Sequence, residues 1–147
     1  MTADKIIALL PYDPPFLFVD GLNHVDENGA EGHYTFRPDE YFYNGHFKNK
    51  PITPGVILTE VMAQIGLVCL GIKLVGENIE DDQALNIALV ENHIHFFLPV
   101  LPNDKVVVKS EKIYFRFGKL KCKVSMMNAS GEVVCKGEIS GMVFNNG

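Results

Sequence analysis

The feature that most constrains the fold is a long apolar run that follows a short polar loop. The stretch NGHFKNKPITPGVILTEVMAQIGLVCLGIKL, from Asn44 to Leu74, has helix-starting chemistry at Thr53 and Pro54. Apolar residues then cover nearly all faces of the helix as far as Leu74, over roughly 30 Å at 1.5 Å per residue. A helix that is apolar all round is buried in the middle of a fold. We therefore expect one central helix, with Thr53 as N-cap, Pro54 as its first residue and Gly55 as its second.

The rest of the chain has mostly the pattern of β-strands. The segments expected to form strands are FLFVDGLNHVD, EGHYTFR, ALNIALVENHIHFF, DKVVVKSEKIYFRF, LKCKVSMMN and EVVCKGEISGMVF. A short helix is expected over Ala3–Leu10, and Gly76 and Asn78 are expected to end the central helix. A hairpin, one long helix and about four more antiparallel strands fit a single sheet wrapped around one helix. This is an α+β architecture, the hot-dog fold.

Size and composition indicate one ordinary globular domain over residues 1–147, since 47% of the residues are hydrophobic and the formal charge is −5. The N-terminus has no signal-peptide pattern, so we expect none. The longest uncharged stretch of the helix, Val61 to Ile72, is shorter than the about 20 residues that a bilayer span requires. Cys69, Cys122 and Cys135 show no metal-ligand spacing. We expect packed, reduced thiols in a cytoplasmic protein without membrane insertion.

The charge is unevenly distributed along the chain. Six basic residues and one acidic residue lie between Lys109 and Lys123, within an otherwise acidic sequence. This favours a local anionic partner over nucleic acid, which usually requires a basic domain. The candidate docking residues are Lys112, Arg116, Lys119, Lys121 and Lys123. The alternative is a solvated edge strand that its lysines protect from aggregation.

The only charge in the first eighteen residues of the helix, Glu60, suggests a chemical role. The N–H groups of Gly55 and Val56 at the helix start can polarise a thioester carbonyl. His46, with a reference pKa near 6.5, can take a proton from the carbon next to that carbonyl. Burial should keep Glu60 protonated, so that it can donate to a leaving hydroxyl while Gln64, one turn further on, orients it. Together these groups describe β-elimination of water from a 3-hydroxyacyl thioester.

Each of these residues also has a purely structural interpretation. A lone loop histidine is most often a surface or packing residue, and Glu60 can form a salt bridge with a strand lysine. His24 and His33, as well as the histidines of the strand segment HIH, are expected to be structural. His93 and His95 share one strand face, so a metal there is the alternative to our expectation of no metal site.

Three segments resemble the FabZ-type 3-hydroxyacyl-[acyl-carrier-protein] dehydratases of the hot-dog superfamily. They are LLPYDPPFLFVD, the spaced motif GHF…P…PGV…E.MAQ, and LPVLPND. The resemblance implies that His46 is the catalytic histidine, Glu60 the catalytic carboxylate and the Gly55 N–H the donor to the thioester carbonyl. Related dehydratase/isomerases carry Asp at the position of Glu60, so glutamate implies dehydration without isomerisation.

The resemblance also implies how the protein works in an assembly. Its members form homodimers whose sheets join edge to edge, and each site combines His46 of one chain with Glu60 of the other. Some members assemble further into hexamers, as trimers of dimers. The implied partner is an acyl carrier protein, whose phosphopantetheine arm carries the substrate, and no other cofactor is implied. An apolar tunnel between subunits takes the acyl chain, in fatty-acid or related polyene or lipid biosynthesis.

The chain departs from the family pattern at three places. Lys48 and Asn49 replace the usual Pro-Gly after His-Phe, and Tyr12-Asp13 replaces His-Arg. Phe97-Leu98 stands where basic residues are common. Two other functions therefore stay open at this point. One is a hot-dog thioesterase in which Glu60 activates water, and the other is a non-catalytic subunit that binds an acyl carrier.

Overall fold

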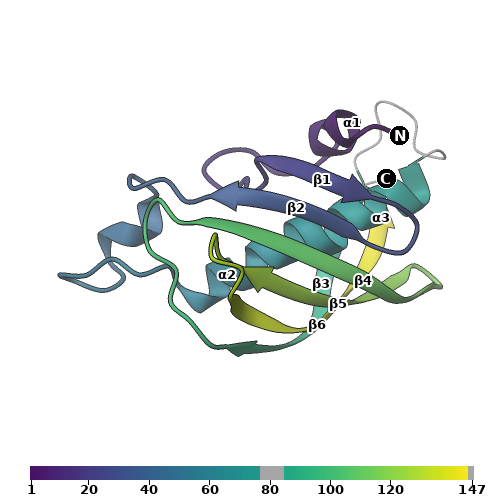
Figure 1. Cartoon of the computed structure of the whole chain (residues 1–147). Coiled ribbons are helices and arrows are strands. Elements are labelled where there is room, and N and C mark those ends of the chain that lie inside the picture. Colours follow the sequence, from purple (N-terminus) through teal and green to yellow (C-terminus); the bar gives the residue numbers. More distant parts are fainter. Residues whose placement is uncertain (77–84, 146–147) are drawn as a thin grey trace.

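The computed structural model describes residues 1–76 and 85–145 (Figure 1). The helical elements are α1 (Ala3–Ala8), the 3₁₀ turn η1 (Tyr41–Asn44), α2 (Gly55–Met62), the π-helical segment η2 (Ala63–Val68) and α3 (Cys69–Val75). The strands are β1 (Gly21–Val25), β2 (Ala30–Thr35), β3 (Leu85–Phe96), β4 (Lys105–Arg116), β5 (Lys119–Met127) and β6 (Val133–Asn145). Asn78, expected to help end the central helix, lies outside the described residues.

The strands form one antiparallel sheet in the order β1-β2-β4-β5-β6-β3. The β1–β2 hairpin extends the sheet beyond β4, and β3 pairs with β6 along its whole length. Figure 1 shows this sheet curving around one continuous helix made of α2, η2 and α3. The expected α+β hot-dog architecture is confirmed, and β3 and β1 are the two edges of the sheet.

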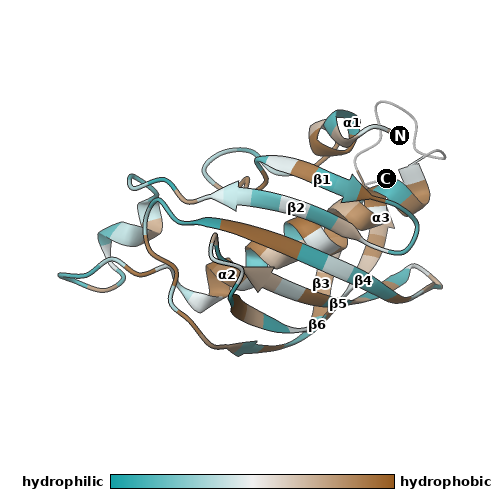
Figure 2. Cartoon of the chain, in the orientation of Figure 1, coloured by the Kyte–Doolittle hydropathy of each residue, from teal (hydrophilic) through white to brown (hydrophobic). Residues whose placement is uncertain are grey.

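The central helix is the core of the fold. The segment Gly55–Val75 is long and apolar enough to cross a membrane, but 78% of its apolar window is buried inside the protein. Figure 2 shows hydrophobic residues along this helix and on the strands that cover it. A Cβ on Gly66 would lie 3.0 Å from the Ser110 Cβ and 3.1 Å from the Val124 Cγ1. Glycine therefore lets the middle of the helix pack directly against β4 and β5.

Element boundaries differ from the sequence prediction at three places. Pro54, not Thr53, is the N-cap of α2, because the Thr53 side chain is buried and its Oγ1 lies 2.6 Å from the Tyr43 hydroxyl. α1 ends at Ala8 rather than Leu10. β1 begins at Gly21, although its pattern starts at Phe16, because the Phe16 carbonyl and the Phe18 N–H bond to Gln64 on the helix and not to a strand.

Candidate active site

Gln64 fixes the position of Glu60 on the central helix. The Gln64 Nε2 donates hydrogen bonds to the Glu60 Oε2 at 3.0 Å and to the Phe16 carbonyl at 2.9 Å. Its Oε1 accepts from the Phe18 N–H at 2.8 Å, which fixes the orientation of the amide group, since a backbone N–H can only donate. Gln64 is fully buried, so its side chain has no water to compete with these partners. The hydrogen bond expected between residues 60 and 64 is therefore present, within a larger network.

Glu60 borders a small and largely apolar cavity of about 260 Å³. The cavity is lined by Tyr12, Phe16, Glu60, Ala63, Leu67, Val68, Ile87 and Leu89. Burial raises the pKa of the Glu60 carboxyl above its usual value, and the hydrogen bond from Gln64 offsets part of this effect. Among the described residues Glu60 has no ion-pair partner, so a salt bridge to a strand lysine does not explain it.

His46 lies in the loop between η1 and α2, where two hydrogen bonds to Ile52 hold it. Its Nδ1 lies 2.8 Å from the Ile52 carbonyl oxygen, and the Ile52 N–H donates to the His46 carbonyl at 2.9 Å. A carbonyl oxygen can only accept, so Nδ1 carries the proton and Nε2 of the neutral ring presents a lone pair. The half-buried ring also stacks on Phe47, with ring centroids 4.3 Å apart. This is the tautomer that a general base acting through Nε2 requires.

The start of α2 presents free hydrogen-bond donors. The Pro54 carbonyl accepts from the N–H groups of Ile57 and Leu58, whereas no group of the described residues accepts from the N–H of Gly55 or Val56. The Phe96 ring lies 3.3 Å from the position that a Cβ on Gly55 would occupy. Glycine thus keeps space beside this ring, where a carbonyl oxygen can accept from the helix N-terminus.

A single chain does not bring all the candidate residues together. His46 does not line the Glu60 cavity, and among the described residues the two side chains make no contact. Tyr12 does line the cavity, although the sequence marked it only as a departure from the family pattern. Burial and the nearby Glu60 carboxylate raise the Tyr12 pKa well above its usual range, so its hydroxyl stays protonated. No local pattern around Tyr12 indicates this position.

The five basic candidate residues do not share one face. A bulge in β4 separates Lys112 from the following residues, and Lys112 pairs with the buried Cys122 on the face of the sheet next to the helix. The opposite face carries Arg116, Lys119, Lys121 and Lys123. These four lie in and beside the β4–β5 hairpin, at the end of the sheet opposite to the start of α2 (Figure 1).

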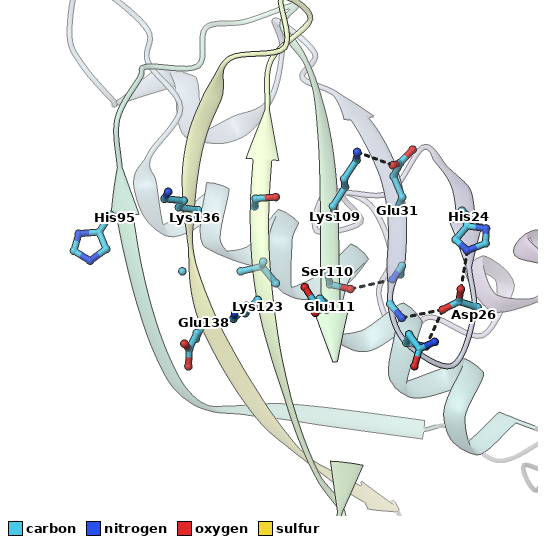
Figure 3. A pocket seen from close by; sticks show the side chains of 16 residues that line it. His24, Asp26, Glu31, His95, Lys109, Ser110, Glu111, Lys123, Lys136 and Glu138 are labelled. Carbon is cyan, nitrogen blue, oxygen red and sulfur yellow. Dashed lines mark hydrogen bonds and ion pairs between the residues drawn. The ribbon is translucent and has the colours of Figure 1, made fainter. Parts of the chain in front are cut away.

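A larger hollow, of about 790 Å³, lies on the face of the sheet away from the helix (Figure 3). Polar contacts already occupy part of its lining, with an ion pair between Lys109 and Glu31 at 3.5 Å and a hydrogen bond between His24 and Asp26 at 2.9 Å. His46 and Glu60 do not line it. We therefore place the candidate active site at the smaller cavity, because the perturbed carboxyl and its positioning network are there.

The architecture and the groups on the central helix define a hot-dog protein. Among solved structures, the dehydratase heterocomplex ApeI:P from Xenorhabdus doucetiae matches with a TM-score of 0.81 and 15% identity, over 99% of this chain and 93% of that chain. A hypothetical thioesterase with coenzyme A from Streptococcus pneumoniae TIGR4 matches with a TM-score of 0.64 and 14% identity, over 84% of each chain. At these identities the likeness shows the fold alone.

Sequence comparison identifies the family. The profile of the FabA-like domain family matches residues 10–141. The 3-hydroxyacyl-[acyl-carrier-protein] dehydratase FabZ of Caldicellulosiruptor bescii is 34% identical over 92% of this chain and 94% of its own length. The Bacillus licheniformis FabZ is 32% identical over 95% of this chain and 93% of its own length. The chain belongs to the FabZ dehydratases within the FabA-like domain family.

The Gln64 network predicts a large effect on stability. Gln64→Leu leaves the buried Phe18 N–H without its acceptor, and each such unsatisfied group costs about 1–3 kcal/mol. We expect the free energy of unfolding, measured with urea, to fall by at least this amount. Asn86→Leu is the control, because the Asn86 Nδ2 is buried without a partner among the described residues and its loss should be nearly neutral. Equal stability of both variants would contradict the network's role.

Proposed function

We infer that this protein is a 3-hydroxyacyl-[acyl-carrier-protein] dehydratase, which removes water from the 3-hydroxyacyl thioester to give the trans-2-enoyl thioester. The observation that carries this inference is the carboxyl of Glu60, which has a raised pKa, is oriented by Gln64 and borders an apolar cavity. Identity of 32–34% to FabZ dehydratases over nearly the whole chain supports the same reaction. It acts in fatty-acid or related lipid biosynthesis.

The N–H groups of Gly55 and Val56 hold the thioester carbonyl in this mechanism. They have no acceptor among the described residues and lie at the positive end of the helix dipole. Proton abstraction at C2 places negative charge on the carbonyl oxygen, and these donors stabilise that charge more strongly than the neutral ground state. The glycine at position 55 allows the close approach that such a hydrogen bond requires.

His46 and Glu60 move the two protons. The Nε2 of neutral His46 takes the proton from C2, while the Ile52 carbonyl keeps Nδ1 protonated and the ring in place. The electron pair of that C–H bond forms the C2=C3 double bond, and the C3–O bond breaks. Protonated Glu60 gives its proton to the departing hydroxyl, which leaves as water. Proton return from the imidazolium to the carboxylate, through solvent, restores both groups.

This mechanism calls for a second copy of the chain, because His46 does not line the Glu60 cavity of its own chain. We propose a homodimer in which β3 pairs antiparallel with β3 of the partner. One side of β3 pairs with β6 and its other side is free, over twelve residues. Leu89, Val90, Phe96 and Phe97 are also 41–54% exposed along this segment. A long apolar edge is a template for strand pairing, and we propose that this pairing brings His46 of one chain to Glu60 of the other.

The proposed substrate carrier is an acyl carrier protein, and we assign no cofactor beyond the phosphopantetheine arm on that carrier. Arg116 and the lysines of β5 are the proposed docking residues for its acidic surface, since they share the face of the sheet away from the helix. We place the protein in the cytoplasm as one domain over residues 1–147. Its three cysteines are buried and unpaired, as expected in a reducing compartment.

A carrier-linked 3-hydroxyacyl thioester tests the reaction and separates it from the alternatives. We expect enoyl absorbance to appear without release of free thiol. Thiol release without an enoyl product indicates a thioesterase and contradicts dehydration. Binding of the acyl carrier without turnover indicates a non-catalytic subunit and also contradicts it. Acyl chains of different lengths in the same assay give the chain-length preference.

A further inference from the structure

Two histidines on the free edge strand form a pair that the dehydratase reaction does not use. The Nε2 atoms of His93 and His95 lie 3.2 Å apart, with ring centroids at 5.0 Å and ring planes at 41°. Both side chains are exposed, and both stand on the face of β3 away from the helix. Figure 3 shows His95 at the edge of the sheet, with its ring directed away from β6.

The separation of the two nitrogens matches that of two ligands on one metal ion. Imidazole nitrogens bind Zn²⁺ at about 2.0–2.1 Å, and two of them at a tetrahedral angle lie about 3.3 Å apart. The i and i+2 positions of a strand share a face, so the backbone directs both rings to the same side. Within the described residues of one chain, no third histidine, cysteine or carboxylate completes such a group.

The partner's β3 can supply the missing ligand in three registers of the proposed dimer. Glu91, His93 and His95 alternate along one face of the strand, and the pairing is regular from Glu91 onward. An antiparallel pair with a two-fold axis at Asn92 sets Glu91 of the partner subunit opposite His93. A two-fold axis at His93 sets the partner's His93 opposite His93. A two-fold axis at Ile94 sets the partner's His95 opposite His93. All three registers bring a further metal ligand to the histidine pair.

We propose that His93 and His95 bind a divalent transition metal such as Zn²⁺ at the dimer interface, in a site that the partner subunit completes. This proposal rests on the edge-to-edge dimer proposed above and not on the dehydration chemistry. Glu138 lies directly across from His93 on β6 but is engaged by Lys121 at 3.4 Å. Lys136 lies across from His95, with its Nζ 5.9 Å from the Phe97 ring centroid. The open direction for a ligand is therefore toward the partner.

The test is titration of untagged, EDTA-treated protein with Co²⁺, followed by competition with Zn²⁺. We expect visible absorption bands typical of four- or five-coordinate Co²⁺, with one or two ions per dimer. Zn²⁺ should abolish these bands by displacing the Co²⁺. The dissociation constant should rise at least about tenfold in H93A and in H95A. H24A/H33A is the matched control, because those histidines also lie on strands, with His24 exposed and His33 half-buried, and contact Asp26 and Asn23.

The oligomeric state, measured by light scattering on the same samples, separates the two proposals. V90K, which places a charge on the free edge of β3, should weaken both dimerisation and Co²⁺ binding. A wild-type dimer that binds Co²⁺ no more tightly than H93A/H95A overturns the metal site and leaves the dimer intact. A wild-type protein that is monomeric and still binds Co²⁺ more tightly than H93A/H95A overturns the contribution of the partner and also the dimer.

Discussion

Replacing Glu60 with glutamine is expected to lower kcat for dehydration by about 10²–10⁴-fold, the usual contribution of a general acid. Glutamine keeps the size of the side chain and can still accept the hydrogen bond from Gln64, so the network to Phe16 and Phe18 should persist. The lost element is the proton for the departing hydroxyl. Steady-state kinetics on a carrier-linked 3-hydroxyacyl thioester measure the effect, and an unchanged kcat would contradict the assignment.

The stability of E60Q provides the control, because the variant should gain free energy of unfolding while it loses activity. The Glu60 pKa is raised in the folded protein, so folding at neutral pH must either bind a proton at Glu60 or bury its charge, and glutamine avoids this cost in folding free energy. Below the ordinary carboxyl pKa both the folded and unfolded chains are protonated, and this difference disappears. We expect E60Q to be more stable than wild type near pH 7–8, with the gain shrinking as pH falls through the raised pKa toward about 4. Urea unfolding across this range measures it.

The second large effect is expected at His46. His46→Ala removes the base that takes the C2 proton, and kcat should fall by about 10²–10⁴-fold. The ring is half-buried, and within the described residues its Nδ1 bonds only to the Ile52 carbonyl, so alanine should disturb the loop and not the core. His33→Ala is the matched control, because His33 bonds to Asn23 on the β1–β2 hairpin and should leave the rate unchanged. Full activity of H46A, or an equal loss in H33A, would rule out His46 as the base.

The central helix shows how far the fold could be predicted from the sequence. Apolar residues on nearly every face required burial, and the alternating segments around it required a covering sheet. The start of β1 could not be predicted in this way. The alternation begins at Phe16, but the fully buried Gln64, distant in the sequence, takes the backbone groups of Phe16 and Phe18. A contact of this kind overrides a local pattern.

The candidate site was predictable only where local spacing along the sequence decides the geometry. Glu60 and Gln64 lie one helical turn apart, so their hydrogen bond follows from spacing alone. His46 lies in an irregular loop, and its link to the Ile52 carbonyl depends on how the whole loop folds. Tyr12 lies within a proline-rich segment that has no period, so no pattern placed it at the cavity. The free edge of β3 became visible only with the strand order.

The most direct test of the two-chain site mixes two inactive variants. H46A and E60Q homodimers each lack one group in both sites, whereas a mixed dimer has one site with both changes and one intact site. After unfolding and refolding of an equal mixture, about half of the dimers are mixed, and we expect about a quarter of the wild-type rate. Dehydration by the mixture that is no faster than by the separate variants would contradict pairing of His46 and Glu60 across the dimer.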